Sequence, residues 1–319
     1  MEGIKTDEIL CLDLGGTKCG WGFLLRDDLS RGNDFSPENL DDFTRSVSVI
    51  LGKRKMIRGI ALATAGVIRD NKIVVVSPNI PWLSGVNLAE WAKDEFGMSC
   101  IVSNDMEAAV AGEMMFGNLV EIRNALMFTI STGLGGAMVV DGKRIISEPG
   151  HMKSPVLINK LSRICECGKI DCVEAQLSGG SVRNLLRLIF TGREDLFEGG
   201  DPCTLLDKKA EAGIPWATNL YNEIGIGIGE VWGSLLNILT DTDRIIYMGT
   251  FGIKGMPFMF PAIKKTMHNR VMFERHKELL KSPLNDDHGL IFKTALEGKN
   301  ALYGAAAVYE EVLGEHYTV

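Results

Sequence analysis

Two stretches of similar pattern decide the fold: residues 9–25, ILCLDLGGTKCGWGFLL, and residues 125–143, ALMFTISTGLGGAMVVDGK. In each, an apolar run rich in strand-forming residues leads into a glycine-rich turn, and a second apolar run follows the turn. This pattern predicts a β-hairpin with glycines at its bend, at residues 13–18 in the first stretch and 132–136 in the second. Because the hairpins begin two successive α/β halves, we expect an internal duplication.

The composition of both turns indicates an anion-binding role. Glycines beside small hydroxyl residues let backbone N–H groups approach a phosphate, and they can adopt the positive φ values that an anion-binding concavity needs. Neither turn has the spacing of a Walker loop, and neither opens a helix as the dinucleotide fingerprint does. A single such turn would be read as a plain tight turn. The pair predicts one phosphate-binding turn per half, with a nucleotide in a cleft between them.

A histidine and three cysteines have the spacing of metal ligands. Cys165, Cys167 and Cys172 form a C-x-C-x4-C pattern, and His151 precedes them. Four side-chain ligands close a tetrahedral zinc site and leave no position for water, so we expect a structural zinc that folds a loop and fixes the acidic residues on either side. The alternative is that three loop cysteines merely lie near one another.

Length and composition are those of a soluble protein of two ordinary domains, with 319 residues, 45% of them hydrophobic and 24% charged. The net charge of -7 and the lack of a long basic run argue against a nucleic-acid surface. Acidic residues stand near the N-terminus where a signal peptide needs basic ones, and the longest apolar stretch, 224–239, contains a glutamate and four glycines. We therefore expect a cytoplasmic protein that binds neither nucleic acid nor membrane.

The remaining segments read as strands and helices of an α/β protein. Further strands are expected at 56–64, 72–76, 99–103 and 244–248, and helices at 87–96, 106–116, 181–190, 215–239 and 301–313. The strand that stops at Asn104 and Asp105 passes directly into a helix, so the carboxylate of Asp105 lies at a corner where ligands gather in open α/β sheets. A loop is expected at 199–202 and a turn at 249–252. The last helix should pack on the first half.

Several motifs occur in a fixed order over nearly the whole chain: Asp13-Leu-Gly-Gly-Thr-Lys, Ser77-Pro78-Asn79, Asn104-Asp105, Thr132-Gly-Leu-Gly-Gly, Glu148-Pro-Gly-His151, CECGKIDCVE and Gly304-Ala-Ala. In this order they resemble the ROK family of repressors, open reading frames and kinases. The resemblance implies an α/β fold of two actin-like (ribonuclease H-like) domains with an interdomain cleft for nucleotide and sugar. It implies an N-terminal domain at 1–117 plus 300–319 and a C-terminal domain at 118–299.

The resemblance also implies roles for individual residues. Asp105 is expected to be the general base that takes the proton of the sugar hydroxyl as it attacks the γ-phosphoryl group of ATP. Its alternative role is that of a helix N-cap. His151 would bind zinc through one ring nitrogen and a sugar hydroxyl through the other. The implied sugar-binding set is Gly66, Asn79, Asn104, Glu148, His151 and Glu174.

A second implied set binds the nucleotide. Asp13 would orient Mg2+ through water. The residues expected around the phosphates on the first turn are Gly15, Gly16, Thr17 and Lys18. Those expected at the far end of the triphosphate are Thr132, Gly133 and Gly135, and Gly249 would lie under the adenosine.

The resemblance implies an ATP-dependent hexose kinase, and Ser77-Pro78-Asn79 favours glucose phosphorylated at its 6-hydroxyl. N-acetylmannosamine, N-acetylglucosamine and fructose kinases share most of this framework and stay open. A sugar-sensing repressor would carry a helix-turn-helix domain ahead of the first hairpin, where we expect no room for one. A sugar-binding protein without catalysis is disfavoured by the two aspartates. The implied partners are sugar, ATP with Mg2+ and a structural Zn2+, in a homodimer or homotetramer.

Some positions depart from the family's pattern. Ser131 stands where glycine is usual, Met106-Glu107 replaces a small residue and asparagine, Asp171 replaces a glycine in the cysteine cluster, and Gly249-Thr250 replaces paired glycines. The gap from His151 to Cys165 is also long. The first phosphate turn therefore matches the family, whereas the adenine pocket and the zinc loop are the places where a rearrangement is expected.

Overall fold

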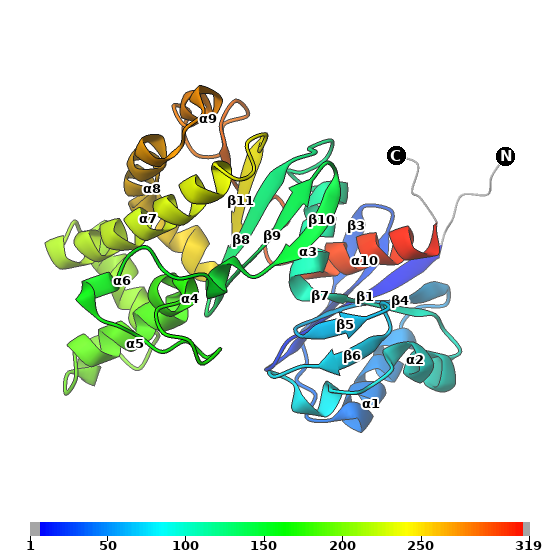
Figure 1. Ribbon diagram of the computed structural model, residues 1–319. Coiled ribbons are helices and arrows are strands. Elements are labelled where there is room, and N and C mark those ends of the chain that lie inside the picture. The colour runs from blue at the N-terminus through cyan, green and yellow to red at the C-terminus, as the bar shows by residue number, and fades with distance from the viewer. Residues whose placement is uncertain (1–6, 315–319) are drawn as a thin grey trace. The chain divides into compact units, whose positions relative to one another are not determined.

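The computed structural model describes residues 7–314, which form two α/β units (Figure 1). Unit 1 comprises the chain up to Glu121 together with the chain from Ala295 onward, and unit 2 is Ile122–Thr294. The chain therefore passes from one unit to the other twice. Residues 1–6 and 315–319, which belong to the expected N-terminal domain, lie outside the described range.

Unit 1 is built on a five-stranded sheet with the order β3-β2-β1-β4-β7. Its strands are β1 (Glu8–Leu14), β2 (Cys19–Leu25), β3 (Asp28–Arg31), β4 (Ile57–Thr64) and β7 (Cys100–Asn104). The first three pair antiparallel, and β1, β4 and β7 pair parallel. The remaining elements are the hairpin β5 (Val67–Arg69) and β6 (Ile73–Val76), the turn η1 (Pro81–Leu83), α1 (Leu40–Leu51), α2 (Leu88–Phe96), α3 (Asp105–Phe116) and α10 (Asn300–Leu313).

Both faces of this sheet are covered. Successive residues of β1 point to opposite faces, so that Leu10 and Leu12 lie in a core with Phe43 of α1, whereas Ile9 lies in a second core with Leu302 of α10. The last helix thus packs on the first sheet, as predicted. Helices α3 and α10 approach closely because Gly304 has no Cβ, which would overlap the carbonyl of Ala108.

Unit 2 repeats the same plan, with the sheet order β10-β9-β8-β11-β12. Its strands are β8 (Ala125–Ile130), β9 (Leu134–Val140), β10 (Lys143–Ser147), β11 (Arg244–Met248) and β12 (Ile291–Lys293). Three antiparallel strands are again followed by two parallel ones. The identical order and directions in the two sheets confirm the predicted duplication and the α/β fold class.

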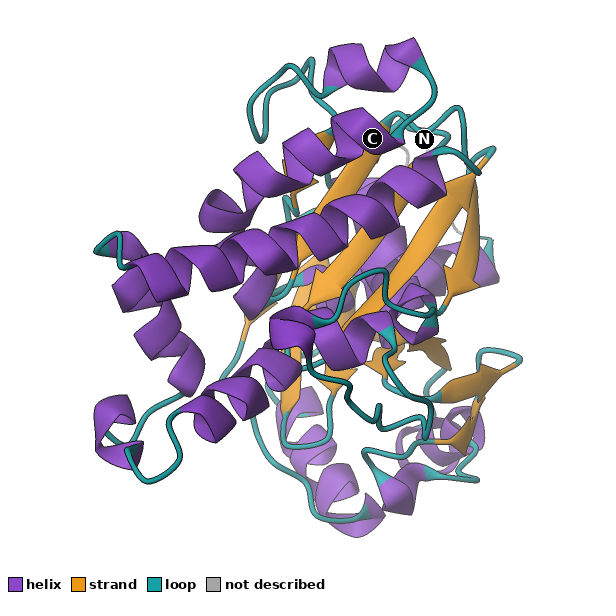
Figure 2. Ribbon diagram, turned by 60° about the vertical axis from the view of Figure 1, so that its left-hand side comes forward, coloured by secondary structure: helices purple, strands orange, loops and turns teal. Residues whose placement is uncertain are grey.

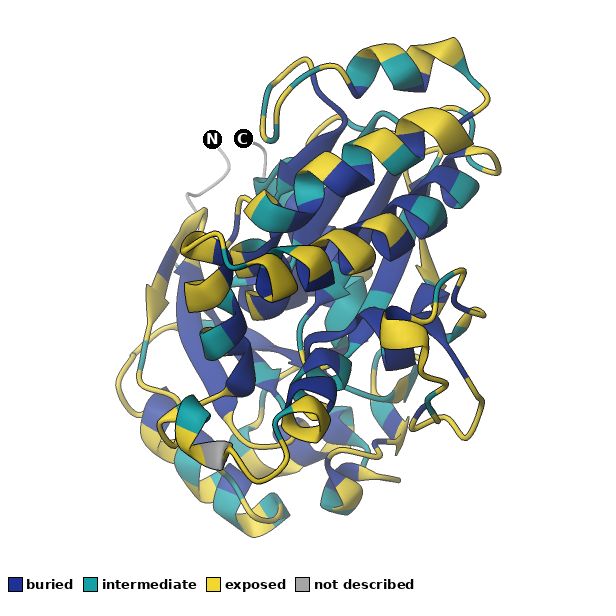
Figure 3. Cartoon of the chain, turned by 90° about the vertical axis from the view of Figure 1, so that its left-hand side faces the viewer, coloured by how far each residue is buried: buried dark blue, intermediate teal, exposed yellow. Residues whose placement is uncertain are grey.

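The helices of unit 2 are η2 (Pro149–His151), η3 (Ile158–Lys160), α4 (Val173–Leu177), α5 (Gly179–Ile189), η4 (Glu194–Phe197), α6 (Pro202–Glu211), α7 (Pro215–Leu236), α8 (Thr250–Arg270) and α9 (Glu274–Leu279). Figure 2 shows the long α7 and α8 side by side across the sheet, and buried and exposed residues alternate along them in Figure 3. Gly225 and Gly229 lie against α8, where a Cβ would come within 2.6 Å of the Met259 oxygen and 2.8 Å of the Thr266 Cβ. The glycine-rich apolar stretch is therefore a buried helix, as predicted.

Two turns differ from expectation. The segment 249–252 is the start of α8, and only Gly249 precedes the helix, with a φ of 89° that favours glycine. In the second hairpin, Gly135 and Gly136 belong to β9, where they pair with Thr129 and Phe128. No helix within residues 7–314 has both the length and the apolar character that crossing a bilayer requires.

Candidate functional site

In unit 1, the predicted general base and the residue predicted to orient Mg2+ lie at the carboxyl ends of two parallel strands, β7 and β1, which flank β4. Asp13 lies near the end of β1 opposite Ala63 of β4, and Asp105 follows β7 as the first residue of α3. Both carboxylates are half-buried. Burial, followed by the charge of Asp105, raises the pKa of Asp13 to about 6, and burial likewise raises the pKa of Asp105. A bound cation would offset the charge of Asp105 and the burial of both carboxylates.

Asn104, rather than Asp105, caps helix α3. Its Oδ1 accepts the N–H groups of Met106 and Glu107 at 2.9 and 3.3 Å, and its Nδ2 donates to the Gly66 carbonyl at 3.0 Å. The alternative role considered for Asp105 thus belongs mainly to its neighbour. The Asp105 carboxylate also accepts the Met106 N–H, at 2.9 Å through Oδ1, which fixes the carboxylate at the strand-to-helix corner.

The first glycine turn contacts the segment that carries Asn79. A Cβ on Gly16 would lie 3.0 Å from the Asn79 carbonyl oxygen, and Gly66 has a φ of 130° at a place where a Cβ would overlap the Val76 carbonyl. The N–H of Gly15 closes the turn by donating to the Lys18 carbonyl at 2.9 Å. The structure therefore brings Asp13, the turn, Gly66, Asn79, Asn104 and Asp105 together in one unit.

Sequence reasoning missed two charged residues beside this turn. Asp34 accepts hydrogen bonds from Lys18 Nζ at 2.7 Å and from Arg31 Nη2 at 3.0 Å, and the bond from Lys18 is the main reason why the pKa of Asp34 is lowered. The positive charge of Arg31 also acts to lower the pKa of Asp13. Neither Arg31 nor Asp34 belongs to a motif, so no signal in the sequence could have placed them. Thr17 is exposed on the turn.

The glycines of the two turns work by close approach. None of Gly15, Gly16 and Gly133 has a positive φ, so the expected left-handed backbone is wrong at these positions. Instead, a Cβ on Gly133 would lie 2.6 Å from Glu174 Oε2. The absence of a side chain at Gly16 and Gly133 lets neighbouring segments contact the turns directly.

In unit 2, the second turn is held by the start of α5 and by Glu174 of α4. The N–H groups of Gly179 and Gly180 donate to the carbonyls of Ser131 and Thr132 at 2.8 and 3.0 Å. Glu174 Oε2 accepts the Leu134 N–H at 2.9 Å. Thr132 and Gly133 are therefore fixed at the turn, whereas Gly135 lies in β9.

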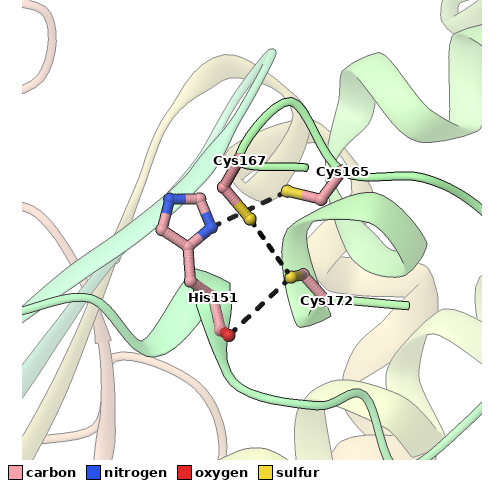
Figure 4. A group of neighbouring side chains, drawn as sticks. All are labelled: His151, Cys165, Cys167 and Cys172. Atoms are coloured by element: carbon pink, nitrogen blue, oxygen red, sulfur yellow. Dashed lines mark hydrogen bonds between the residues drawn. The ribbon is translucent and has the colours of Figure 1, made fainter. Parts of the chain in front are cut away.

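The structure brings together the four predicted metal ligands, which lie in residues 151–172, here called the cysteine–histidine loop (Figure 4). The ligand atoms of His151, Cys165, Cys167 and Cys172 all lie within 4.8 Å of one another. The Sγ atoms of Cys167 and Cys172 are 3.6 Å apart, and Cys165 Sγ lies 3.7 Å from His151 Nδ1.

These distances fit a tetrahedral zinc site. A disulfide would need about 2.0 Å between sulfur atoms. Zinc bonds of about 2.3 Å to sulfur and 2.0 Å to nitrogen give tetrahedral edges of roughly 3.5 to 3.8 Å. Nδ1 of His151 faces Cys165, so Nδ1 is the ring nitrogen on the side of the cysteines. Glu148, three residues earlier, is exposed, and its carbonyl accepts the His151 N–H at 3.0 Å.

A cavity of about 210 Å3 opens beside the second turn in unit 2. It is lined by Ser131, Thr132, Gly179, Arg183, Asp201, Cys203, Thr204, Asp207, Thr250, Phe251 and Lys254. Helix α8 begins at Thr250, which lines the cavity. The free N–H groups and the positive end of the helix dipole at this N-terminus favour an anion. Arg183 forms a two-bond pair with Asp201, at 3.0 and 2.7 Å, which lowers the pKa of Asp201.

Two residues of the predicted nucleotide-binding set lie at or beside this cavity. Thr132 was expected at the phosphates, and Gly249, expected under the adenosine, directly precedes the cavity residue Thr250. Arg183, Asp207 and Lys254 were missed, because they lie on three separate helices and share no motif.

The chain belongs to the ROK family, whose sequence profile matches residues 9–311. An N-acetylmannosamine kinase of Salmonella typhi is 26% identical over 255 residues, covering 76% of this chain and 83% of that protein. A protein named as a xylose repressor from Caldicellulosiruptor sp. is 25% identical over 195 residues, 56% of this chain and 48% of the relative. The match to an uncharacterised Clostridium perfringens protein also covers 48% of its length, so the chain spans about half of these two relatives.

Among solved structures, the chain is similar to a ROK family glucokinase from Streptomyces griseus that was crystallised with glucose and AMPPNP. The TM-score is 0.72 at 22% identity, with 94% of this chain and 98% of that chain covered. At this identity the likeness establishes the shared fold, in agreement with the two sheets of identical order.

Proposed function

We propose that the protein is an ATP-dependent sugar kinase that transfers the γ-phosphoryl group of ATP to a sugar hydroxyl. The observation that carries the proposal is the pairing of Asp13 with Asp105 at the strand ends, beside the glycine turn. Phosphoryl transfer needs a positioned acceptor for the hydroxyl proton and compensation of phosphate charge, and little covalent chemistry from the protein. Family membership and the N-acetylmannosamine kinase relative support the same activity.

In this proposal Asp105 takes the proton of the sugar hydroxyl. The hydroxyl oxygen forms the new bond to the γ-phosphorus, and the bond from that phosphorus to ADP breaks. The raised pKa of Asp105 makes it a better proton acceptor than an ordinary carboxylate, and the Met106 N–H holds it in place. Asp13 would orient Mg2+, which when bound neutralises phosphate charge. Gly15, Gly16, Thr17 and Lys18 would contact the phosphates through the first turn.

The cavity in unit 2 is the proposed site of the adenosine end of the nucleotide, with the second glycine turn beside it for phosphate oxygens. Thr132 and Gly133 would bind phosphate oxygens through backbone N–H groups, and the start of α8 adds a favourable helix dipole. The cavity's mixed lining of Arg183, Asp207 and Lys254 offers both donors and acceptors to ribose and base.

We propose Gly66, Asn79 and Asn104 as sugar-binding residues in unit 1, and Glu148, His151 and Glu174 as sugar-binding residues in unit 2. Zinc at the cysteine–histidine loop would fix the Nδ1 side of His151 and leave Nε2 for a hydroxyl, so the metal would act on the sugar through its ligand.

Glucose, phosphorylated at its 6-hydroxyl, is our first candidate, supported by Ser77-Pro78-Asn79 and the contact of Asn79 with the first turn. N-acetylmannosamine is the second, supported by the relative that matches over most of both chains. A sugar-sensing function like that of the named repressor would not need the aspartate pair, which therefore favours the kinase.

The test is ADP release in the presence of ATP, Mg2+ and a panel of free sugars: glucose, N-acetylmannosamine, N-acetylglucosamine and fructose. We expect one of them to raise ADP release well above the rate without sugar. A protein that binds one of these sugars in calorimetry but releases no sugar-dependent ADP would be a binding protein, and the proposal would be wrong.

A further inference from the structure

Asp171, which directly precedes Cys172, is a buried residue in a backbone conformation that favours glycine. Its φ is 58° and its exposed fraction is 5%. A non-glycine residue adopts this left-handed conformation at a cost, so its side chain is expected to make contacts that offset the strain. We propose that Asp171 is a positioning residue that holds the cysteine–histidine loop in its metal-binding arrangement.

The carboxylate of Asp171 accepts four hydrogen bonds. Oδ1 accepts the Arg163 N–H at 2.7 Å and the Gln176 side-chain amide at 2.9 Å. Oδ2 accepts the Ser162 hydroxyl at 2.8 Å and the Lys153 ammonium at 3.2 Å. Because an ionised carboxylate offers about four lone-pair positions, these donors satisfy a group that would otherwise be costly to bury.

The backbone of Asp171 joins the same segments. Its N–H donates to the Arg163 carbonyl at 2.8 Å, and its carbonyl accepts the Ser154 N–H at 2.8 Å. Next to it, Ile164 and Ile170 form an antiparallel bridge. Asp171 therefore lies between two segments and is bonded to each through both its main chain and its side chain.

Each segment that Asp171 contacts carries one of the candidate ligands. The donors to the Asp171 carboxylate include Lys153, two residues after His151, the backbone N–H of Arg163, two residues before Cys165, and Gln176, four residues after Cys172. One carboxylate thus contacts the segments of three of the four ligands. The fourth, Cys167, lies in the turn between Cys165 and Cys172. Ligands that are held in place before binding lose less conformational freedom when the metal arrives, so this arrangement should raise metal affinity. Outer partners of metal ligands typically contribute about 10- to 100-fold in affinity.

The inference rests on the proposed zinc site and does not depend on the kinase activity. Its test compares three variants. Asp171→Asn keeps the size of the side chain but sets an amide N–H2 against two of the four donors. Asp171→Gly removes the carboxylate and at the same time relieves the left-handed backbone, which separates the lost contacts from strain. The control, Glu166→Gln, removes the same charge from an exposed side chain between Cys165 and Cys167.

The measurement is the dissociation constant of zinc, obtained by competition with a chromophoric chelator in the absence of sugar and nucleotide. Asp171→Asn and Asp171→Gly should each raise it by about 10- to 100-fold. Glu166→Gln should change it by less than about fivefold, the scale of an exposed charge. In a cobalt(II) titration, the visible bands of tetrahedral thiolate coordination should reach the same final spectrum in all variants but need more cobalt in the two Asp171 variants. A purely structural role would lower the unfolding temperature and leave the metal affinity of the folded protein unchanged.

Wild-type zinc affinity in both Asp171 variants would overturn the inference, and so would an equal loss in Glu166→Gln, which would make the effect one of charge alone. Failure of the unaltered protein to bind zinc or cobalt would overturn it together with the zinc site. The sugar panel separates this result from the function. If the protein is an active kinase and its zinc affinity is unchanged in the Asp171 variants, only the inference is wrong. An inactive protein whose zinc affinity depends on Asp171 rejects only the kinase.

Discussion

The carboxylate of Glu174 accepts a hydrogen bond from the backbone N–H of Leu134, with 2.9 Å between Oε2 and N. This bond joins α4, the helix that follows the cysteine–histidine loop, to the second glycine turn. The other oxygen, Oε1, lies 3.6 Å from the Sγ of Cys165. Glu174 follows Cys172 by two residues. A disturbance of the metal ligands can therefore reach the turn proposed to bind the triphosphate, as well as the sugar residues.

Replacing Glu174 by alanine should weaken the binding of both substrates. The loss of the bond to Leu134 loosens the phosphate turn, and the loss of the carboxylate removes a proposed sugar contact. We expect KM to rise roughly tenfold for ATP as well as for sugar, the scale of one hydrogen bond to a charged group. Glu174→Gln, whose side-chain carbonyl can still accept the Leu134 N–H, should largely spare KM for ATP. Steady-state kinetics with each substrate varied would show this, and an unchanged KM for ATP in the alanine variant would contradict the link.

Protein purified without chelator should contain about one zinc per chain, the stoichiometry of a single four-ligand site. Cys167→Ser should release it, because serine oxygen is a poor substitute for a thiolate. The loss should raise KM for sugar more than KM for ATP, since the loop carries His151 directly. Elemental analysis checks the first statement and kinetics the second. Metal-free protein with full activity would show that the four residues are not a zinc site.

The stability of the protein should depend on pH through Asp13. Burial raises its pKa from 3.8 to about 6, so the folded state holds the proton more tightly than the unfolded chain. The resulting stabilisation is complete below about pH 4 and is lost as pH rises through 6. At pH 8, Asp13→Asn should therefore have a larger free energy of unfolding than the unaltered protein, by at most about 3 kcal/mol before solvent screening is considered. The difference should shrink toward pH 4.

Denaturant unfolding of both proteins, without Mg2+ or nucleotide, would measure this difference at several pH values. If the asparagine variant were less stable at pH 8, or if the difference did not change with pH, the account of the aspartate pair would be wrong.

Glu113 of α3 holds the two places where the chain leaves and re-enters unit 1. Its carboxylate is fully buried and accepts the N–H groups of Asn118 at 2.7 Å and Ala295 at 3.0 Å, and the Asn300 side-chain amide at 3.1 Å. Glu113→Ala would bury these donors without this acceptor, so we expect a loss of about 3 kcal/mol in the free energy of unfolding. Glu95→Ala, on an exposed position of α2, serves as the control and should cost less than about 0.5 kcal/mol. Equal effects of the two substitutions in denaturant unfolding would argue against this role.

Local patterns predicted much of the fold. The apolar runs on either side of the first turn gave β1 and β2, since nearly continuous burial leaves a clear strand signal. The passage from β7 into α3 at Asp105 was predicted for the same reason. The register and the matching order of the two sheets required the structure, because pairing between distant strands leaves no local mark in the sequence.

The residues that sequence reasoning missed act through contacts between distant segments. Asp171 was expected to disturb the cysteine loop, yet its carboxylate braces it, because four donors from separate segments converge on it. Asp34 and Arg183 meet partners that no motif identifies. The turn glycines were expected to allow both a close approach and a positive φ. Neighbouring segments do approach Gly16 and Gly133 closely, but neither residue has a positive φ.

The most direct test of the central claim is the turnover of Asp105→Asn. Asparagine keeps the size of the side chain and can still accept the Met106 N–H, but it cannot take the hydroxyl proton. We predict that kcat falls by at least ~10²-fold, the usual scale for the loss of a positioned base, while sugar affinity measured by calorimetry stays within about threefold. Turnover comparable to that of the unaltered protein would contradict the assignment of Asp105 as the base, and with it the proposed mechanism.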